Sequence, residues 1–403
     1  MTAQAPAPRG PLGGMRVIDL GRIVAGPFCA MMLGDFGADV IKIETPPDGD
    51  FLRHQAPKFA DDVGSYFATA NRNKRSVMLD LRSPEGLAAL RRLLAEADVL
   101  VENFRPGVLE KMGLDEATLQ REFPRLVVAR VAAYGHVGPM KDEPGVDQLV
   151  QGISGHMAIT GTVETGPIRS GIAICDILGA LCATMGVLAA LVERAASGRG
   201  QIVRTSLLEA MLGMMSMQAG KYFATGVDPK PEGNHHPVIA PYGAFETSDG
   251  YVQLQVMHER QFVALAKACG RPEWLDDPRM NTNPARAANM PYVRETVARA
   301  IATRSTAEWL RDLHAADIGC GPILSVAEAF RSAQALATEM VQHMHLNDGT
   351  EVTIPGFPVK LSRTPAALHR PPPRLGEHTA EVLGSADAPG AARPGKRERG
   401  GRT

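Results

Sequence analysis

Short apolar runs alternate with segments of helical spacing along the first third of the chain. Five runs rich in β-branched or other apolar residues predict strands, at Met15–Leu20, Ala38–Glu44, Ser76–Leu81, Asp98–Phe104 and Leu126–Ala133. Helical spacing predicts helices between them, at Pro27–Asp35, at residues 84–96 behind the capping pair Ser83-Pro84, and at Asp115–Glu122. Because successive strand–helix–strand units form parallel sheets, the pattern predicts an α/β, Rossmann-like domain with helices on both faces of its sheet.

The middle of the chain changes from loop to long helix. Gly135–Arg169 is rich in Gly and Pro and is expected to be a loop region. From Asp176 onward, apolar residues recur at helical spacing as far as Val192, and the turn Ser197–Gly200 ends this helix. A second helix is predicted at Ser206–Gln218, and its methionines Met211, Met214 and Met215 are interpreted as core residues.

A shift in composition separates a second domain. Residues 225–241 are rich in Pro, Gly and His and are interpreted as a linker, followed by a hairpin around Ser248-Asp249-Gly250 and by helical patterns to residue 315. Strands at Thr350–Ile354 and Pro358–Leu361 are expected to return to the first domain. The prediction is a large domain of residues 12–224 completed by 340–384, a smaller α/β domain of 225–335, and flexible tails at 1–11 and 385–403.

Length and charge exclude several classes. The 403 residues carry 43 basic and 44 acidic side chains, a net charge of −1, which argues against nucleic acid as the main partner. The longest apolar run, Ile177–Val192, is diluted by Ala and Gly, so no membrane span is expected, and no signal peptide is recognised. The five cysteines form no CxxC pair and are interpreted as reduced thiols of a cytoplasmic protein.

Common cofactor motifs are missing from the sequence. The first strand–helix turn, Leu20–Pro27, is not GxGxxG, and neither a P-loop nor a GxSxG elbow occurs, so NAD and ATP are not expected as cofactors. His235-His236 and His343/His345 lie outside any HExxH or Cys/His framework and are interpreted as loop or surface residues. No metal site is therefore predicted.

Asp176 is the residue most suggestive of chemistry. As the first polar residue before a long helix, it has the ordinary interpretation of a helix N-cap. Its apolar neighbours Ile174 and Cys175 favour a second interpretation. A rigid, partly desolvated carboxylate, kept ionised by the helix dipole, meets the conditions for a nucleophile.

A group of basic residues gathers in the first third of the chain, namely Arg72, Lys74, Arg75, Arg82, Arg105 and Lys111. Taken singly, each is expected to be a solvated charge. Arg82 and Arg105 follow predicted strands, at the edge where open parallel sheets bind ligands. Their recurrence favours a site for an anionic, phosphate-bearing ligand.

An ordered series of motifs along the chain, which includes several of these basic residues, resembles the family III CoA-transferases. That family is the group of formyl-CoA and carnitine CoA-transferases and α-methylacyl-CoA racemase. The resemblance runs from about Leu12 to Leu383. The motifs that carry it are Val17–Leu20, Ala25–Pro27, Gly37–Glu44, Asn71–Ser76, Val101–Gly107, Asp147 with Ser154-Gly155, Ser197–Gln201 and Leu375–Thr379.

The resemblance implies a mechanism and a site. The family's nucleophilic aspartate falls on Asp176, which would form an aspartyl mixed anhydride and then an aspartyl-CoA thioester. The implied CoA contacts are Val24, Ala25, Thr45, Leu79, Asp80, Leu81, Arg82, Asn103, Phe104, Arg105, Lys111, Tyr134 and Asp147. His236 and Tyr134 are candidate contacts of the acceptor acid. Coenzyme A would be substrate and product, and members of the family are interlocked homodimers.

Departures from the family pattern narrow the reaction. Racemases of the family have His before the residue matched by Asp147, whereas this chain has Val146, which disfavours racemisation. The formyl-CoA enzymes carry a tetraglycine lid and Gln where this chain has Val24. The segments 236–243 and 169–173 look more like the branch that uses succinyl-CoA and short dicarboxylic acids. The expectation is CoA transfer to a free acid, with an acyl-CoA racemase or epimerase and a non-catalytic CoA-binding protein as alternatives.

Overall fold

The chain forms two compact units. The computed structural model describes residues 10–236, 238–366 and 368–384, so the predicted tails, 1–11 and 385–403, lie outside the described residues apart from residues 10 and 11. The first unit comprises residues 1–154, 170–217 and 337–403, and the second comprises 155–169 and 218–336. Residues 155–169, assigned above to the large domain, group with the second unit, where Gly233 N donates to Gly161 O at 2.8 Å.

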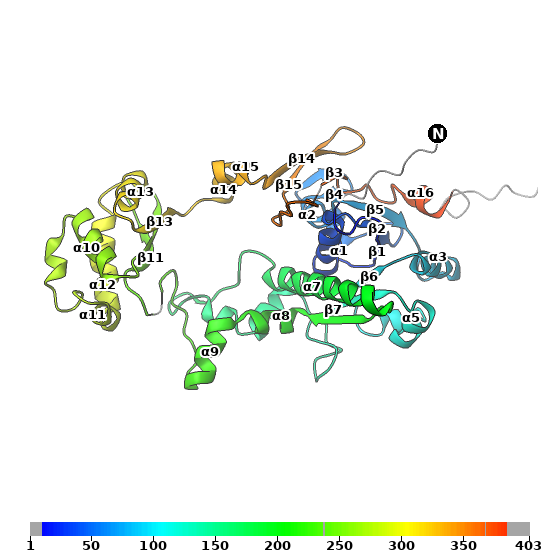
Figure 1. The fold of residues 1–403 in the computed structure, drawn as a ribbon, viewed down its shortest axis with the longest axis horizontal. Helices are drawn as coiled ribbons and strands as arrows, with labels where there is room; N and C mark the ends of the chain where they lie inside the picture. The colour runs from blue at the N-terminus through cyan, green and yellow to red at the C-terminus, as the bar shows by residue number, and fades with distance from the viewer. Residues whose placement is uncertain (1–9, 237, 367, 385–403) are drawn as a thin grey trace, which may run out of the picture. The chain divides into compact units, whose positions relative to one another are not determined.

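The first unit is built on a six-stranded, fully parallel sheet (Figure 1). Its strands lie in the order β10-β7-β6-β1-β2-β5. Their bounds are β1 Arg16–Asp19, β2 Asp39–Glu44, β5 Lys74–Met78, β6 Val99–Glu102, β7 Val127–Ala132 and β10 Ile202–Ser206. The predicted strand at Ser76–Leu81 therefore begins and ends earlier, whereas the other four agree to within about two residues.

Some helices of this unit begin at local capping residues. The helix bounds of this unit are α1 Ala25–Asp35, α2 Ser65–Asn71, α3 Pro84–Ala95, α4 Val108–Lys111, α5 Glu116–Glu122, α6 Asp147–Ile153, α7 Ile174–Ser197, α8 Leu207–Met214 and α16 Thr379–Leu383. Ser83 and Asp115 cap α3 and α5 as expected, and Gly198 ends α7 with a φ of 74°. The region 135–169 is not loop throughout, because it contains α6.

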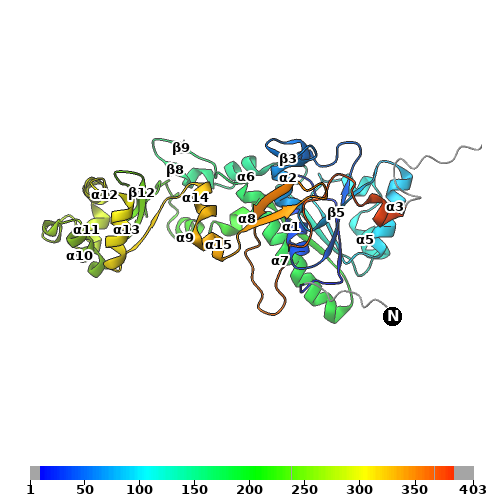
Figure 2. The same cartoon turned by 90° about the horizontal axis from the view of Figure 1, so that it is seen from above.

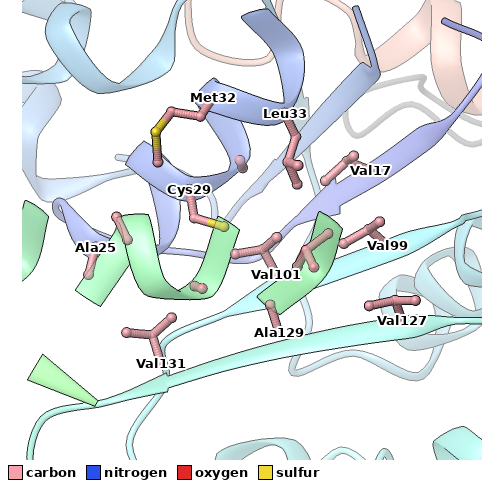
Figure 3. Close-up of a cluster of buried hydrophobic side chains, with 14 of the residues drawn as sticks. Val17, Ala25, Cys29, Met32, Leu33, Val99, Val101, Val127, Ala129 and Val131 are labelled. Carbon is pink, nitrogen blue, oxygen red and sulfur yellow. The ribbon is translucent and has the colours of Figure 1, made fainter. Parts of the chain in front are cut away.

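The strands bury both faces because their side chains alternate. Val17, Val99 and Val127 face a core shared with α1 and α7, which Figure 3 shows in close-up. Their neighbours Ile18 and Leu100 face the opposite core, under α3 and α5. An apolar residue at every strand position is what a sheet covered on both faces requires.

α7 is, within the described chain, a helix long and apolar enough to cross a membrane, although the sequence predicted a long helix here and no membrane span. It spans 24 residues, and it packs on α1, α8 and β7 inside the first unit, as core helices do (Figure 1).

Smaller elements complete the first unit. Two antiparallel pairs occur, β3 Lys58–Ala60 with β4 Val63–Gly64, and β14 Val341–His345 with β15 Glu351–Pro355. Figure 2 shows the orange pair β14–β15 beside α2. The expectation of a strand at Pro358–Leu361 is wrong. The partner of β15 precedes it instead, across the turn at residues 346–350, because that turn closes a hairpin.

The second unit has its own sheet and core. Its antiparallel sheet has the order β11-β12-β13, with bounds Tyr242–Glu246, Tyr251–Gln255 and Gly319–Pro322. Its helices are α10 Glu259–Ala268, α11 Asn283–Ala288, α12 Met290–Ile301, α13 Thr306–Ala315 and α14 Val326–Arg331. The unit also contains a short antiparallel pair, β8 Gly161–Thr162 with β9 Gly166–Pro167. Phe262, Trp274 and Trp309 are central to its buried cluster. Helices α9 Ser216–Thr225 and α15 Ala333–Ala337 lie where the chain passes between units.

Candidate active site

The sheet order places a crevice between β1 and β6. From β1 the chain continues to β2 and β5 on one side, and it returns to β6, β7 and β10 on the other. The loops that leave β1 and β6 at their carboxyl ends therefore diverge, and open α/β sheets bind ligands at such a switch point.

A cavity of about 550 Å³ lies at this point, entirely within the first unit. Seven of the residues implied by the resemblance line it, namely Val24, Ala25, Asn103, Phe104, Arg105, Asp147 and Asp176. The fold thus brings together groups that are as much as 152 positions apart in the sequence. The volume is within the range of ordinary small-molecule pockets.

Asp176 lies in the first turn of α7 rather than at its N-cap position, which Ala173 occupies. The N-cap interpretation is therefore wrong. The acceptor for the helix N-terminus is Asp147, whose Oδ1 accepts from the backbone N–H groups of Cys175 at 2.8 Å and Asp176 at 3.3 Å. Asp147 was implied as a CoA contact, and the structure shows that it also caps the helix that carries Asp176.

The ionisation of Asp176 differs from the expectation. Burial, reinforced by the negative charge of Asp147, raises the pKa of Asp176 to about 7. The expected stabilisation of the charged form by the helix dipole is therefore outweighed, because desolvation acts on the whole charge whereas the helix end carries only partial charges. At neutral pH both protonation states of Asp176 are populated.

The loop after β1 is held by buried charges. Asp19 Oδ1 accepts from Gly21 N at 2.8 Å, and Lys42 Nζ donates to Gly21 O at 2.9 Å. The side-chain amide of Asn103 pairs with both backbone groups of Arg22, at 2.8 and 2.9 Å.

The next residue of this loop, Ile23, has a φ of 66°. A β-branched residue is strained in that region, by on the order of 1–3 kcal/mol. The loop that forms one wall of the cavity is therefore fixed by the residues beneath it.

Three of the basic residues predicted to form an anion site are paired with aspartates instead. Arg72 pairs with Asp35, Lys74 with Asp19 and Arg75 with Asp39, and all three basic side chains are largely buried beneath the loops. A buried charge needs a partner, so these residues hold the sheet together instead of meeting a ligand. Sequence spacing could not show this, because each acidic partner lies 36 to 55 positions away.

The remaining basic residues stay accessible. Arg82 is exposed and pairs with Asp80, and Arg105 and Lys111 are exposed at the carboxyl end of β6 and on α4. Thr45 Oγ1 accepts from the Arg22 guanidinium at 3.3 Å, near the cavity wall.

The apolar residues implied as contacts have packing roles. The side chains of Leu79 and Leu81 belong to the core under α3, and Tyr134 is buried in the core next to Gly145. A Cβ at Gly145 would lie 2.8 Å from the Tyr134 ring, so glycine is required there for the ring to pack.

His236 lies in the second unit. Its Nδ1 accepts from the backbone N–H groups of Val238 and Ile239, at 3.2 and 3.1 Å, and its ring stacks on Tyr242 with centroids 5.0 Å apart. These contacts order its own loop.

Sequence reasoning missed Gln151 and Gln148, and it used Val146 only as a departure from the racemase pattern. Gln148 and Val146 line the cavity, and Gln151 donates to Asp147. A signal was present in the spacing, because Asp147 and Gln151 are four residues apart and share one face if the segment is helical. Treating 135–169 as loop concealed it.

Comparison with known proteins decides the family. The family model described as CoA-transferase family III matches residues 12–379. The chain is a family III CoA-transferase. As such, it is an enzyme that transfers CoA between an acyl-CoA and a carboxylic acid.

Relatives of this CoA-transferase cover it almost end to end. It is 38% identical to the succinate–glutarate CoA-transferase of Agrobacterium fabrum, over 94% of this chain and 96% of the relative. It is 35% identical to the succinyl-CoA:glutarate CoA-transferase of Mus musculus, over 93% and 86%. Among solved structures, a CAIB/BAIF family protein from Brucella suis aligns with a TM-score of 0.86 and 36% identity, over 93% and 98%.

Proposed function

We propose that this CoA-transferase takes CoA from succinyl-CoA or another short dicarboxylic acyl-CoA and transfers it to a small carboxylic acid through covalent intermediates on Asp176. The observation that carries the proposal is the placement of Asp176 in the switch-point cavity, partly buried and free of a capping role. The names of the two relatives support the choice of donor.

The chemistry needs one carboxylate that is both nucleophile and leaving group. Asp176 attacks the thioester carbonyl, the carbon–sulfur bond breaks, and CoA leaves as thiolate from an aspartyl mixed anhydride. The thiolate attacks the aspartyl carbonyl and expels the donor acid. The acceptor carboxylate then attacks the aspartyl thioester and expels the thiolate, which gives a second aspartyl mixed anhydride. The thiolate attacks the acceptor's carbonyl carbon in that anhydride, forms the new acyl-CoA and releases the Asp176 carboxylate. Each intermediate stays activated, so no nucleotide is consumed.

The environment of Asp176 suits these roles. A desolvated carboxylate with a pKa of about 7 is more nucleophilic than a hydrated one, and a useful fraction is ionised at neutral pH. The N-terminal turn of α7 supplies positive partial charge near the carbonyl oxygen that becomes negative during attack.

We propose that the CoA thioester lies against Val24, Ala25, Asn103 and Phe104, with Arg105 near its phosphates. Thr45, the segment 79–82 and Lys111 follow the carboxyl ends of β2, β5 and β6, so they extend the same edge. Roles for Tyr134 and His236 toward the acceptor remain part of this proposal.

The alternatives have less support. A racemase of this family would need a base where Val146 lines the cavity, and an aliphatic side chain cannot transfer a proton. A non-catalytic role was tied to capping by Asp176, and Asp147 performs that capping.

We also propose a cytoplasmic homodimer that works without NAD, ATP or metal. Five free cysteines fit a reducing compartment. Among the described residues, no cluster of three or more His, Cys, Asp or Glu side chains could hold a metal. Leu181, Met185 and Val192 form an exposed apolar stripe on α7, which a second copy would cover.

The test is direct trapping of the intermediate. After incubation with succinyl-CoA and cleavage by hydroxylamine or borohydride reduction, we expect the mass of the peptide containing Asp176 to change. Asp176→Asn should keep CoA binding and lose turnover by at least about a thousandfold, while the exposed control Asp61→Asn should match the parent enzyme. An unmodified peptide, or turnover retained by Asp176→Asn, refutes the mechanism.

The identity of the acids needs a substrate panel. Succinyl-, glutaryl- and acetyl-CoA are each offered with mono- and dicarboxylic acceptors, and the products are read by mass spectrometry. Preference for acetyl-CoA over both dicarboxylic donors would contradict the proposed donor class.

A further inference from the structure

We infer that Gln151 is a positioning residue for the transfer reaction, acting on Asp176 through Asp147. The inference rests on the proposed role of Asp176. It comes from the way in which α6 is connected to the first turn of α7 by side chains.

Gln151 is fully buried and all parts of its side-chain amide are used. Its Nε2 donates to Asp147 Oδ2 at 2.6 Å and to the backbone oxygen of Ile172 at 3.4 Å. Its Oε1 accepts from Ser170 N at 2.7 Å. One side chain thus holds both Asp147 and the segment that leads into α7.

Asp147 transmits this constraint to the nucleophile. With Oδ2 bound by Gln151, the other oxygen Oδ1 is directed at the N–H groups of Cys175 and Asp176. The backbone of Asp176, which itself lines the cavity, is therefore fixed at its own amide. A displacement of about 1 Å at a reacting group can cost on the order of a hundredfold in rate.

The amide group is well matched to this position. Gln151 satisfies one oxygen of Asp147 as a neutral donor, so it adds no positive charge that would offset the effect of Asp147 on the pKa of Asp176. A basic residue in its place would offset the charge of Asp147 and favour the ionised form of Asp176.

Two substitutions separate the contacts. Gln151→Met keeps the volume and removes every hydrogen bond of the amide. Gln151→Asn keeps a neutral amide but is one methylene shorter, so it cannot reach Asp147 Oδ2 and Ser170 N together. If Gln151→Met does not fold, Gln151→Asn still tests the contact. The exposed Gln201→Leu is the control for loss of a glutamine.

The readouts are kcat, KM for succinyl-CoA, the rate of Asp176 acylation in a single turnover, and hydrogen exchange at the amides of Cys175 and Asp176. We expect acylation and kcat to fall about 10- to 100-fold with KM changed less than about threefold. Exchange at both amides should accelerate, while Gln201→Leu changes none of these values.

Unchanged acylation in both variants overturns the inference, even if exchange accelerates, because the contact would then be structural only. Slower acylation without faster exchange also overturns it, because the effect would not pass through the start of α7. Asp176→Asn in the same assays keeps the two proposals distinct. If it stays active, the proposed function fails. If it is inactive while the Gln151 variants match the parent enzyme, only this inference fails.

Discussion

Asp147 on α6 and Asp176 on α7 are both aspartates, and their different surroundings distinguish them. Asp147 is bound by three donors, so its charge is held in place. Asp176 has its pKa raised to about 7 by burial and by Asp147. The sequence alone singled out Asp176 as the candidate nucleophile and, through the family resemblance, Asp147 as a CoA contact. It assigned the cap of α7 to Asp176, whereas the cap comes from Asp147, 28 positions before Cys175.

Neutralising Asp147 should shift the pH dependence of catalysis. Its charge raises the pKa of Asp176, so Asp147→Asn should lower that pKa. Only the ionised carboxylate attacks, so acylation is lost as pH falls through the pKa, and the variant should retain it to lower pH. The measurement is the single-turnover acylation rate against pH. An acid limb that is unchanged or moved to higher pH would contradict the assigned cause.

Replacing Asp176 should stabilise the fold at alkaline pH. The pKa of the Asp176 carboxyl is about 7 in the folded protein, against 3.8 for an unperturbed aspartate. Between these values the unfolded chain gives up the proton more readily, so stability falls as pH rises through this window and stays lower above it. Asp176→Asn lacks this loss and should gain on the order of 1–3 kcal/mol above neutral pH. Urea unfolding at acid and alkaline pH checks this, and an equal or lower stability at alkaline pH would refute it.

At the scale of elements, regular patterns were predictable and irregular ones were not. The strands β1, β2, β5, β6 and β7 and the helices α3, α5, α7 and α13 carry strong periodicity or caps, whereas the edge strand β10 was not predicted. The short α6, which carries Asp147 and Gln151, is surrounded by Gly and Pro and has few turns, so local signals do not reveal it. The long α7 was predictable because its apolar residues recur at helical spacing. Its tertiary contacts also require small residues at defined points.

One such point is Gly186, whose Cβ would lie 2.4 Å from Val203 Cγ1 on β10. We expect Gly186→Ala to destabilise the protein by about 1–3 kcal/mol, since a rigid β-branched neighbour cannot move aside. Adding Val203→Ala should restore part of the loss. Gly213 on α8 has no atom of the chain within 4 Å of an added Cβ, so Gly213→Ala is the control. Equal urea midpoints for Gly186→Ala and Gly213→Ala would contradict the packing argument.

At the scale of the whole molecule, the net charge of −1 conceals opposing roles. Several basic residues in the first third of the chain form buried ion pairs, and others remain exposed at the edge of the sheet. The apolar surface is likewise uneven. Leu181, Met185 and Val192 are 40, 57 and 75% exposed along one face of a core helix. Exposed apolar stripes of this kind mark interaction surfaces.

We therefore expect a homodimer in solution, measured by sedimentation velocity or light scattering. Met185→Asp places a charge in the middle of the stripe and should convert the dimer to monomer or aggregate, because a buried unpaired charge is costly. Arg199→Asp, an exposed charge reversal after the end of α7, should stay dimeric. A monomeric parent protein, or an unaltered Met185→Asp dimer, would contradict the proposed interface.

The sequence by itself determined the parallel α/β sheet, the second domain, the family and the candidate nucleophile. These follow from periodicity, caps and ordered motifs, which are properties of neighbouring residues. Only the tertiary structure decided which charges are buried, which carboxylate caps α7, and what pKa Asp176 has. Those depend on distances between residues far apart in the chain, such as Lys74 and Asp19 at 2.7 Å across 55 positions. Burial and charge act through space, so the chemistry of the site became defined only when the chain folded around it.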